Sequence, residues 1–331
     1  MNRQVHLISY PDGLPGPGDF ALMDAPHVEP QAGEVQVDVL ALGMDPFPRL
    51  RMRADSRVGP PLPLGRVMDG RGVGRVRASH DPAFAPGDLV AGELGWQEVV
   101  VLPGAALTKL DAALGPPHRH LSALGPSGLT AWFSIELLAI APGDTVVIAP
   151  AAGSVGSIAD QLAAERGARV VGIASGPEQA AFLTNMGFAA TVDARAPDLA
   201  QALAATCPDG ANAFLDGVGG PLHDAVIVRL ALHARVVLLG FIATYADRAP
   251  PAYGAAAPIL FKRATVRGFL LADHSARFDI ARAELAARLA DGRLRAVETI
   301  WDGLDKAPAA FAALFGDAAP GKQIVRVREY A

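Results

Sequence analysis

Two patterns of hydrophobic and polar residues divide the chain near Leu124. Before that residue the chain holds short runs rich in β-branched residues, and turns with proline, glycine and aspartate separate them. Closely spaced short strands of this kind indicate a small barrel or sandwich. The strands predicted in this part are residues 34–40, 72–77, 89–91 and 98–102.

After Leu124, continuous apolar runs of strand length alternate with segments of helical periodicity. This alternation indicates a parallel sheet with helices on both faces. The predicted strands are residues 145–149, 169–174, 190–193, 213–216, 235–239 and 266–271, and the predicted helices are residues 154–166, 177–186, 198–206, 221–231 and 280–290. A last strand at 322–328 is expected to return to the first domain, so the predicted domains are 1–123 with 296–331, and 124–295.

A glycine turn follows the first strand of the second domain. Ala151-Ala152-Gly153-Ser154-Val155-Gly156 has the spacing of the dinucleotide pattern G-x-G-x-x-G, with alanine in the first position. Gly153 would let the backbone approach a pyrophosphate, and Gly156 would let the helix pack on the strand. The alternative is an ordinary tight turn, but its place between a strand and a helix favours a nucleotide site.

The tip of the next strand indicates which dinucleotide binds. An Asp or Glu there would bind the ribose 2′-hydroxyl of NAD, but the tip carries Ser175 and no acid. Ser175 can donate a hydrogen bond, and Arg195 follows the third strand. These residues favour NADP.

Composition and charge exclude several classes of protein. The 331 residues are 51% hydrophobic, which is enough to form a sizeable core, and the net charge of −5 gives no reason to expect a nucleic-acid partner. No apolar run reaches the length of a membrane span or follows a basic start like a signal peptide, so a soluble cytoplasmic protein is expected. Cys207 is the sole cysteine, and the histidines, His118 and His120 included, lack a clear metal-binding pattern, so a zinc-free enzyme is expected.

Short segments along nearly the whole chain resemble one family. They are Asp45-Pro46-Phe47, 64–68, 86–88, 128–131, 151–157, 208–210, 216–220, 240–245, 268–269, 302–304 and 321–322. In order and spacing they are similar to the zinc-independent branch of the medium-chain dehydrogenase/reductases, which contains prostaglandin, 2-alkenal and curcumin reductases. The resemblance implies an α/β protein, with a GroES-like β-barrel catalytic domain and a Rossmann domain.

The resemblance also implies a reaction. Members of this branch reduce the C=C bond of α,β-unsaturated aldehydes and ketones with NADPH, by hydride transfer to the β-carbon. In this branch the charge on the carbonyl oxygen is stabilised by the nicotinamide ribose 2′-hydroxyl and by a tyrosine that matches Tyr245. Tyr245 also follows a predicted strand at its carboxyl end, where open α/β sheets bind ligands; a packed or surface loop tyrosine is the alternative.

Further cofactor contacts follow from the resemblance, position by position. They are Thr130, Gly153, Ser154, Val155, Gly156, Gly240, Phe241, Ile242, Phe269, Leu270 and Leu271. Several positions depart from the family, and two of them concern the cofactor: Gln179 replaces the lysine that binds the 2′-phosphate, and Ala194 replaces a tyrosine near it. NAD therefore stays an alternative cofactor, with Arg195 as a compensating cation.

Aromatic residues are predicted around a small apolar unsaturated carbonyl substrate: Phe47, Trp132 and Tyr253. For these three, ordinary core or rim packing is the alternative. Arg49 would favour an anionic or phenolic substrate, unless it belongs to a solvated basic loop. A homodimer is expected from the family. Two other functions stay open, an NAD(P)H quinone oxidoreductase of the same fold and an NADP-binding protein without turnover.

Overall fold

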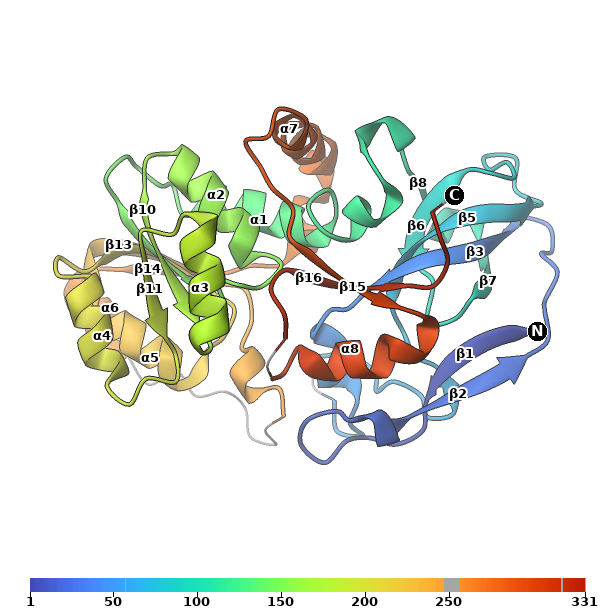
Figure 1. Cartoon of the computed structure of the whole chain (residues 1–331), viewed down its shortest axis with the longest axis horizontal. Coiled ribbons are helices and arrows are strands. Elements are labelled where there is room, and N and C mark those ends of the chain that lie inside the picture. The colour runs from blue at the N-terminus through green and yellow to red at the C-terminus, as the bar shows by residue number, and fades with distance from the viewer. Residues whose placement is uncertain (57, 247–255, 317, 331) are drawn as a thin grey trace. The chain divides into compact units, whose positions relative to one another are not determined.

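The computed structural model describes residues 1–56, 58–246, 256–316 and 318–330, and the chain forms two compact units. Unit 1 comprises Met1–Ser122, Glu298–Ala318 and Lys322–Ala331. Unit 2 comprises Ala123–Val297 and Ala319–Gly321. Both ends of the chain therefore belong to unit 1 (Figure 1).

Unit 1 is mainly β-structure. Its strands are β1 (Asn2–Leu7), β2 (Phe20–Ala25), β3 (Glu34–Gly43), β4 (Arg66–Val67), β5 (Arg71–Ser79), β6 (Leu89–Glu93), β7 (Val99–Pro103), β8 (Thr108–Lys109), β15 (Glu298–Asp302) and β16 (Lys322–Arg326). Within the described residues, one sheet has the order β15-β16-β3-β5-β6-β8 with β7 also paired to β3, and another has the order β2-β1-β4. Helix α8 (Ala307–Ala313) adds Phe311 to a core that includes Phe20 and Trp96.

Unit 2 is a parallel sheet with helical connections. Its strands are β9 (Thr145–Ala149), β10 (Arg169–Ala174), β11 (Ala190–Asp193), β12 (Ala211–Asp216), β13 (Leu230–Leu238) and β14 (Thr265–Gly268). Its helices are α1 (Pro126–Leu137), α2 (Gly156–Glu165), α3 (Pro177–Met186), α4 (Leu199–Thr206), α5 (Gly220–Val228), α6 (Ala256–Lys262) and α7 (Phe278–Ala290). The predicted parallel sheet is confirmed, with all described strand pairs parallel in the order β11-β10-β9-β12-β13-β14.

Several predicted element boundaries in unit 2 are wrong; the strands predicted at 213–216 and 235–239, for example, are Ala211–Asp216 and Leu230–Leu238. The helix predicted at 221–231 ends at Val228, because Leu230 already pairs with Ala211 of β12 before the register shifts. The strand predicted at 266–271 ends at Gly268, where it pairs with Leu238, the last residue of β13. In both places the length of the neighbouring strand decides where the element ends.

Candidate functional site

The strand order of unit 2 places a topological switch point between β9 and β12. The chain adds β10 and β11 on one side of β9, and then β12, β13 and β14 on the other side. Open parallel sheets bind ligands at the carboxyl ends of strands that flank such a point, because the connections diverge there. The candidate site therefore consists of the turns that follow β9, β10, β12 and β13 (Figure 1).

The turn after β9 contains the four predicted residues 153–156 and leads directly into α2. Ser157 N donates a hydrogen bond to Gly153 O at 3.0 Å. A Cβ atom at Gly156 would lie 2.2 Å from the carbonyl oxygen of Pro150, so a larger residue does not fit there. At Gly153 a Cβ would make ordinary contacts at 3.4 Å and beyond. The tight turn brings the first N–H groups of α2 to the carboxyl end of β9, an arrangement that suits a pyrophosphate.

The tip of β10 gathers the residues predicted to select the cofactor. Ser175 N donates a hydrogen bond to Gln179 Oε1 at 2.9 Å. Gly176 N and Arg195 N both donate to Asp193 Oδ1, at 3.1 and 2.9 Å. Arg195 Nη1 lies 3.7 Å from the position that a Cβ would take at Gly176. A guanidinium group therefore stands beside a strand tip that carries no carboxylate of its own.

Asp193 is the residue of this group that sequence analysis did not assign. It ends β11, the strand next to β10, and its side chain joins the turns that follow these two strands. The position of Asp193 at the end of a predicted strand could have marked it as a candidate. The N–H groups that its carboxylate binds could not be predicted, because they depend on which strands are neighbours in the sheet.

The loop after β13 contains the predicted catalytic residue. Tyr245 is buried, and its ring packs edge-on against Phe241 with 5.1 Å between the ring centroids. Its hydroxyl oxygen lies 3.2 Å from the position of a Cβ at Gly240. Ile242 N donates to Gly217 O at 3.3 Å, which ties this loop to the turn after β12. The Tyr245 hydroxyl is thus turned back towards the carboxyl end of β13.

The remaining predicted cofactor residues lie on two other segments of unit 2. Thr130 is half-buried on α1. Phe269 follows β14, and its N–H donates to Leu238 O at 3.1 Å. Leu270 is exposed, whereas Leu271 is half-buried. Phe269 continues the pairing with the end of β13, so it starts at the same edge of the sheet as the Tyr245 loop.

The side chain of Trp132 makes its contacts with other residues of unit 2. Its indole Nε1 donates to Glu284 Oε2 of α7 at 3.1 Å, and the guanidinium carbon of Arg277 lies 5.1 Å from the centroid of its ring. These contacts support the packing alternative for this residue. Tyr253, the third predicted aromatic residue, lies outside the described residues.

The two predicted substrate residues of unit 1 have opposite environments. Phe47 is half-exposed, whereas Arg49 is 2% exposed, in the 3-10 helix Phe47–Arg51. The Arg49 guanidinium donates to the carbonyl oxygens of Gly13 and Met52, and burial lowers the pKa of this guanidinium. Arg49 therefore holds two loop segments together, and it is not part of a solvated basic loop.

No group of three His, Cys, Asp or Glu side chains that could hold a metal ion occurs among the described residues. Cys207 is buried next to the end of α4, and burial raises the pKa of its thiol. A helix both long and apolar enough to cross a membrane is likewise absent from the described residues.

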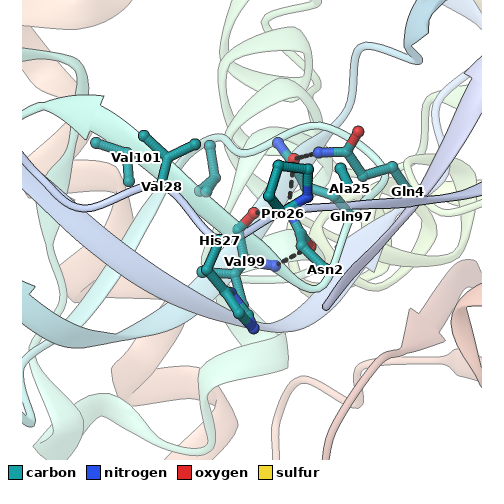
Figure 2. A pocket seen from close by; sticks show the side chains of 10 residues that line it. Asn2, Gln4, Ala25, Pro26, His27, Val28, Gln97, Val99 and Val101 are labelled. Atoms are coloured by element: carbon teal, nitrogen blue, oxygen red, sulfur yellow. Dashed lines mark hydrogen bonds between the residues drawn. The ribbon is translucent and has the colours of Figure 1, made fainter.

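Unit 1 contains a separate small cavity of about 330 Å³, shown in Figure 2. Three of its polar residues are hydrogen-bonded: Asn2 Nδ2 donates to Val99 O at 2.8 Å, and Gln4 Nε2 donates to Gln97 Oε1 at 2.9 Å. None of the predicted site residues lines this cavity.

Comparison with known proteins assigns the family. Residues 3–110 match the family described as the N-terminal domain of oxidoreductase, and residues 154–287 match the one described as zinc-binding dehydrogenase. The chain is 34% identical to the NADPH-dependent curcumin reductase of Escherichia coli, over 98% of this chain and 97% of that protein. It is 32% identical to the NADP(+)-dependent 2-alkenal reductase of Nicotiana tabacum, over 98% and 97%.

The chain belongs to the zinc-independent branch of the medium-chain dehydrogenase/reductases. Its fold agrees with that of a solved relative, CurA from Vibrio vulnificus in complex with NADPH. The two structures match with a TM-score of 0.93 and 32% identity over 99% of each chain. The predicted fold class, a Rossmann domain joined to a GroES-like domain, is confirmed.

Proposed function

We propose that the protein reduces the C=C bond of α,β-unsaturated aldehydes and ketones with NADPH. The observation that carries the proposal is the buried Tyr245 hydroxyl, which packs at the carboxyl end of β13, in a loop bonded to the turn after β12. The names of the two relatives, a curcumin reductase and a 2-alkenal reductase, support the substrate class.

The residues present fit a dinucleotide with a 2′-phosphate. Gly156 leaves room for a tight turn that a Cβ would fill, so the start of α2 can approach a pyrophosphate. Arg195, beside the tip of β10, supplies a cation for the 2′-phosphate, and Gln179 lies at the same tip. A guanidinium forms charge-assisted hydrogen bonds with phosphate oxygens, so we propose that NADPH is preferred over NADH.

In the proposed reaction, NADPH supplies a hydride to the β-carbon of the substrate. The electron pair of the C=C bond moves towards the carbonyl oxygen, which takes up enolate charge, and the α-carbon then takes a proton from water. Tyr245 donates a hydrogen bond to that oxygen from its phenol. Hydrogen-bond donors aimed at a developing charge are often the largest single contribution to catalysis.

A substrate screen tests this function. Purified protein is mixed with NADPH or NADH and with a 2-alkenal, an aryl enone or a quinone, and oxidation of the nicotinamide is followed by absorbance. We expect turnover with the alkenal and the enone, and a higher kcat/KM with NADPH. Turnover with quinones alone would favour the quinone oxidoreductase alternative, and binding of NADPH without any turnover would favour the non-catalytic one.

We also propose that the protein is a homodimer. In the described part of unit 2, β14 is the last strand of the sheet and pairs with β13 alone. Large apolar side chains are exposed close to it in sequence: Leu260 (70%), Phe261 (74%) and Leu270 (68%). Exposed apolar side chains that form a patch often mark interfaces, and a twofold arrangement is the commonest. Light scattering should give twice the chain mass of 34.2 kDa, and Phe261→Asp should give a monomer; a monomeric wild type would refute the proposal.

A further inference from the structure

A buried carboxylate lies at the switch point of the sheet, and the site described above does not account for it. Asp216 is the last residue of β12, and its side chain is fully buried. Its Oδ1 accepts hydrogen bonds from Val218 N at 2.8 Å and from Gly219 N at 2.9 Å. Its Oδ2 lies 2.7 Å from His223 Nδ1, so the imidazole donates the third hydrogen bond.

The turn that Asp216 holds is bonded to both neighbouring parts of the candidate site. Gly217 N donates to Ala149 O at 2.7 Å, at the end of β9 and before the glycine turn. On the other side, Ile242 N donates to Gly217 O at 3.3 Å, and Ala243 N donates to Val218 O at 3.1 Å. Residues 217–218 therefore connect the strand that leads into the glycine turn with the loop that carries Tyr245.

His223 bridges this turn with a hydrogen bond. The backbone after the turn passes through Gly219 and Gly220, which have φ angles of +70° and +61° and therefore intrinsic conformational freedom. His223 lies on α5, is 2% exposed, and binds back across these glycines to Asp216. The hydrogen bond of the pair thus links the end of β12 to the first turn of α5, across the glycines that lie between them.

We propose that Asp216 and His223 form a positioning pair, which sets the place of the Tyr245 loop relative to the glycine turn. The inference rests on the proposed function, because it assigns a catalytic use to that alignment. The pair itself contacts neither cofactor nor substrate in this account. Loss of the imidazole would shift the loop and lower turnover, because misplacement by about 1 Å can cost about 100-fold in rate. Nucleotide affinity would change less than turnover, because residues 153–156 and Arg195, which lie outside the Tyr245 loop, would keep their contacts.

The test compares His223→Leu, which removes the hydrogen bond, with His223→Asn, which keeps a side-chain donor near the Nδ1 position. His80→Leu, at an exposed position in unit 1, is the matched control. We expect kcat with an enone at saturating NADPH to fall at least tenfold in His223→Leu, with less than a threefold change in the Kd of NADPH. His223→Asn should recover most of kcat, and the control should match the wild type.

An unchanged kcat in folded His223→Leu, or a kcat in His223→Asn as low as in the leucine variant, would overturn the proposal. If His223→Leu does not fold, His223→Gln takes its place, because the longer side chain of glutamine would displace the turn. We expect this variant to have a lower kcat and a normal affinity for NADPH. A wild-type kcat in His223→Gln would then overturn the proposal. Hydrogen exchange tests the positioning role of the pair independently of the proposed enone reduction. The amides of Val218, Gly219, Ile242 and Ala243 should exchange faster in His223→Leu even if no enone is reduced, and unchanged exchange would contradict the pair's role.

Discussion

Asp160 makes the stability of unit 2 depend on pH in an unusual direction. It lies on α2, four residues after the glycine that begins the helix, and is 2% exposed. No described residue donates a hydrogen bond to its carboxyl group or pairs with it. Burial alone raises the pKa of Asp160 from 3.8 to about 7, because the charged form loses its hydration without gaining a partner.

The size of the effect follows from the two pKa values. A carboxyl group with a raised pKa in the folded state contributes stability that is present in full below the unfolded pKa near 3.8 and is lost as the pH rises to about 7. Each pH unit within this range costs about 1.4 kcal/mol, so the complete loss is about 4 kcal/mol. Between pH 5 and pH 8 the free energy of unfolding should therefore fall by about 2 to 3 kcal/mol through this residue.

Asp160→Asn removes the titration and keeps the shape of the side chain. Urea unfolding of the wild type and the variant, followed by circular dichroism at pH 5, 6, 7 and 8, gives the difference in stability at each pH. We expect that difference to shift in favour of the variant by about 2 to 3 kcal/mol between pH 5 and pH 8. Asp209→Asn, the same change at an exposed position of unit 2, should show no such trend. A difference independent of pH for Asp160→Asn would show that the pKa of Asp160 is not raised by burial.

Three further predictions concern the site. Gly156→Ala should destabilise unit 2 by about 1 to 3 kcal/mol and abolish NADPH binding, because its Cβ would lie 2.2 Å from Pro150 O; a normal melting temperature would contradict this. Arg195→Ala should lower kcat/KM for NADPH about 10- to 100-fold through the lost charged hydrogen bond and leave NADH unchanged, and equal loss with both cofactors would argue against a 2′-phosphate contact. Prolonged dialysis against a chelator should leave turnover intact, and activity that returns only with zinc would contradict a zinc-free mechanism.

Much of unit 2 could be predicted from local patterns. The strands Thr145–Ala149 and Arg169–Ala174 and the helix Pro177–Met186 have the predicted ends, because apolar runs and nearby glycine or proline mark them in the sequence. The three residues Ala319–Gly321 show the limit of such patterns. They join unit 2 through the hydrogen bond from Gly321 N to Ala152 O at 2.8 Å, which no local pattern indicates.

Part of the candidate site could be predicted from the sequence, and part of it could not. The glycine turn is a local feature, and its spacing in the sequence is enough to predict it. The roles of Asp193 and of the Asp216–His223 pair depend on which strand ends become neighbours in the sheet, so they appear only with the fold. Arg49 is predicted to contact the substrate. In the structure its guanidinium instead donates hydrogen bonds to backbone carbonyl oxygens.

The role of the Tyr245 hydroxyl is tested by the kcat of Tyr245→Phe with an enone at saturating NADPH, measured beside Tyr330→Phe as a control in unit 1. Removal of one donor to a developing oxyanion typically costs about 100-fold or more in kcat. We expect a loss of this order in Tyr245→Phe, with the Kd of NADPH changed less than threefold and with the control like the wild type. A wild-type kcat in Tyr245→Phe would show that this hydroxyl does not stabilise the charge on the substrate.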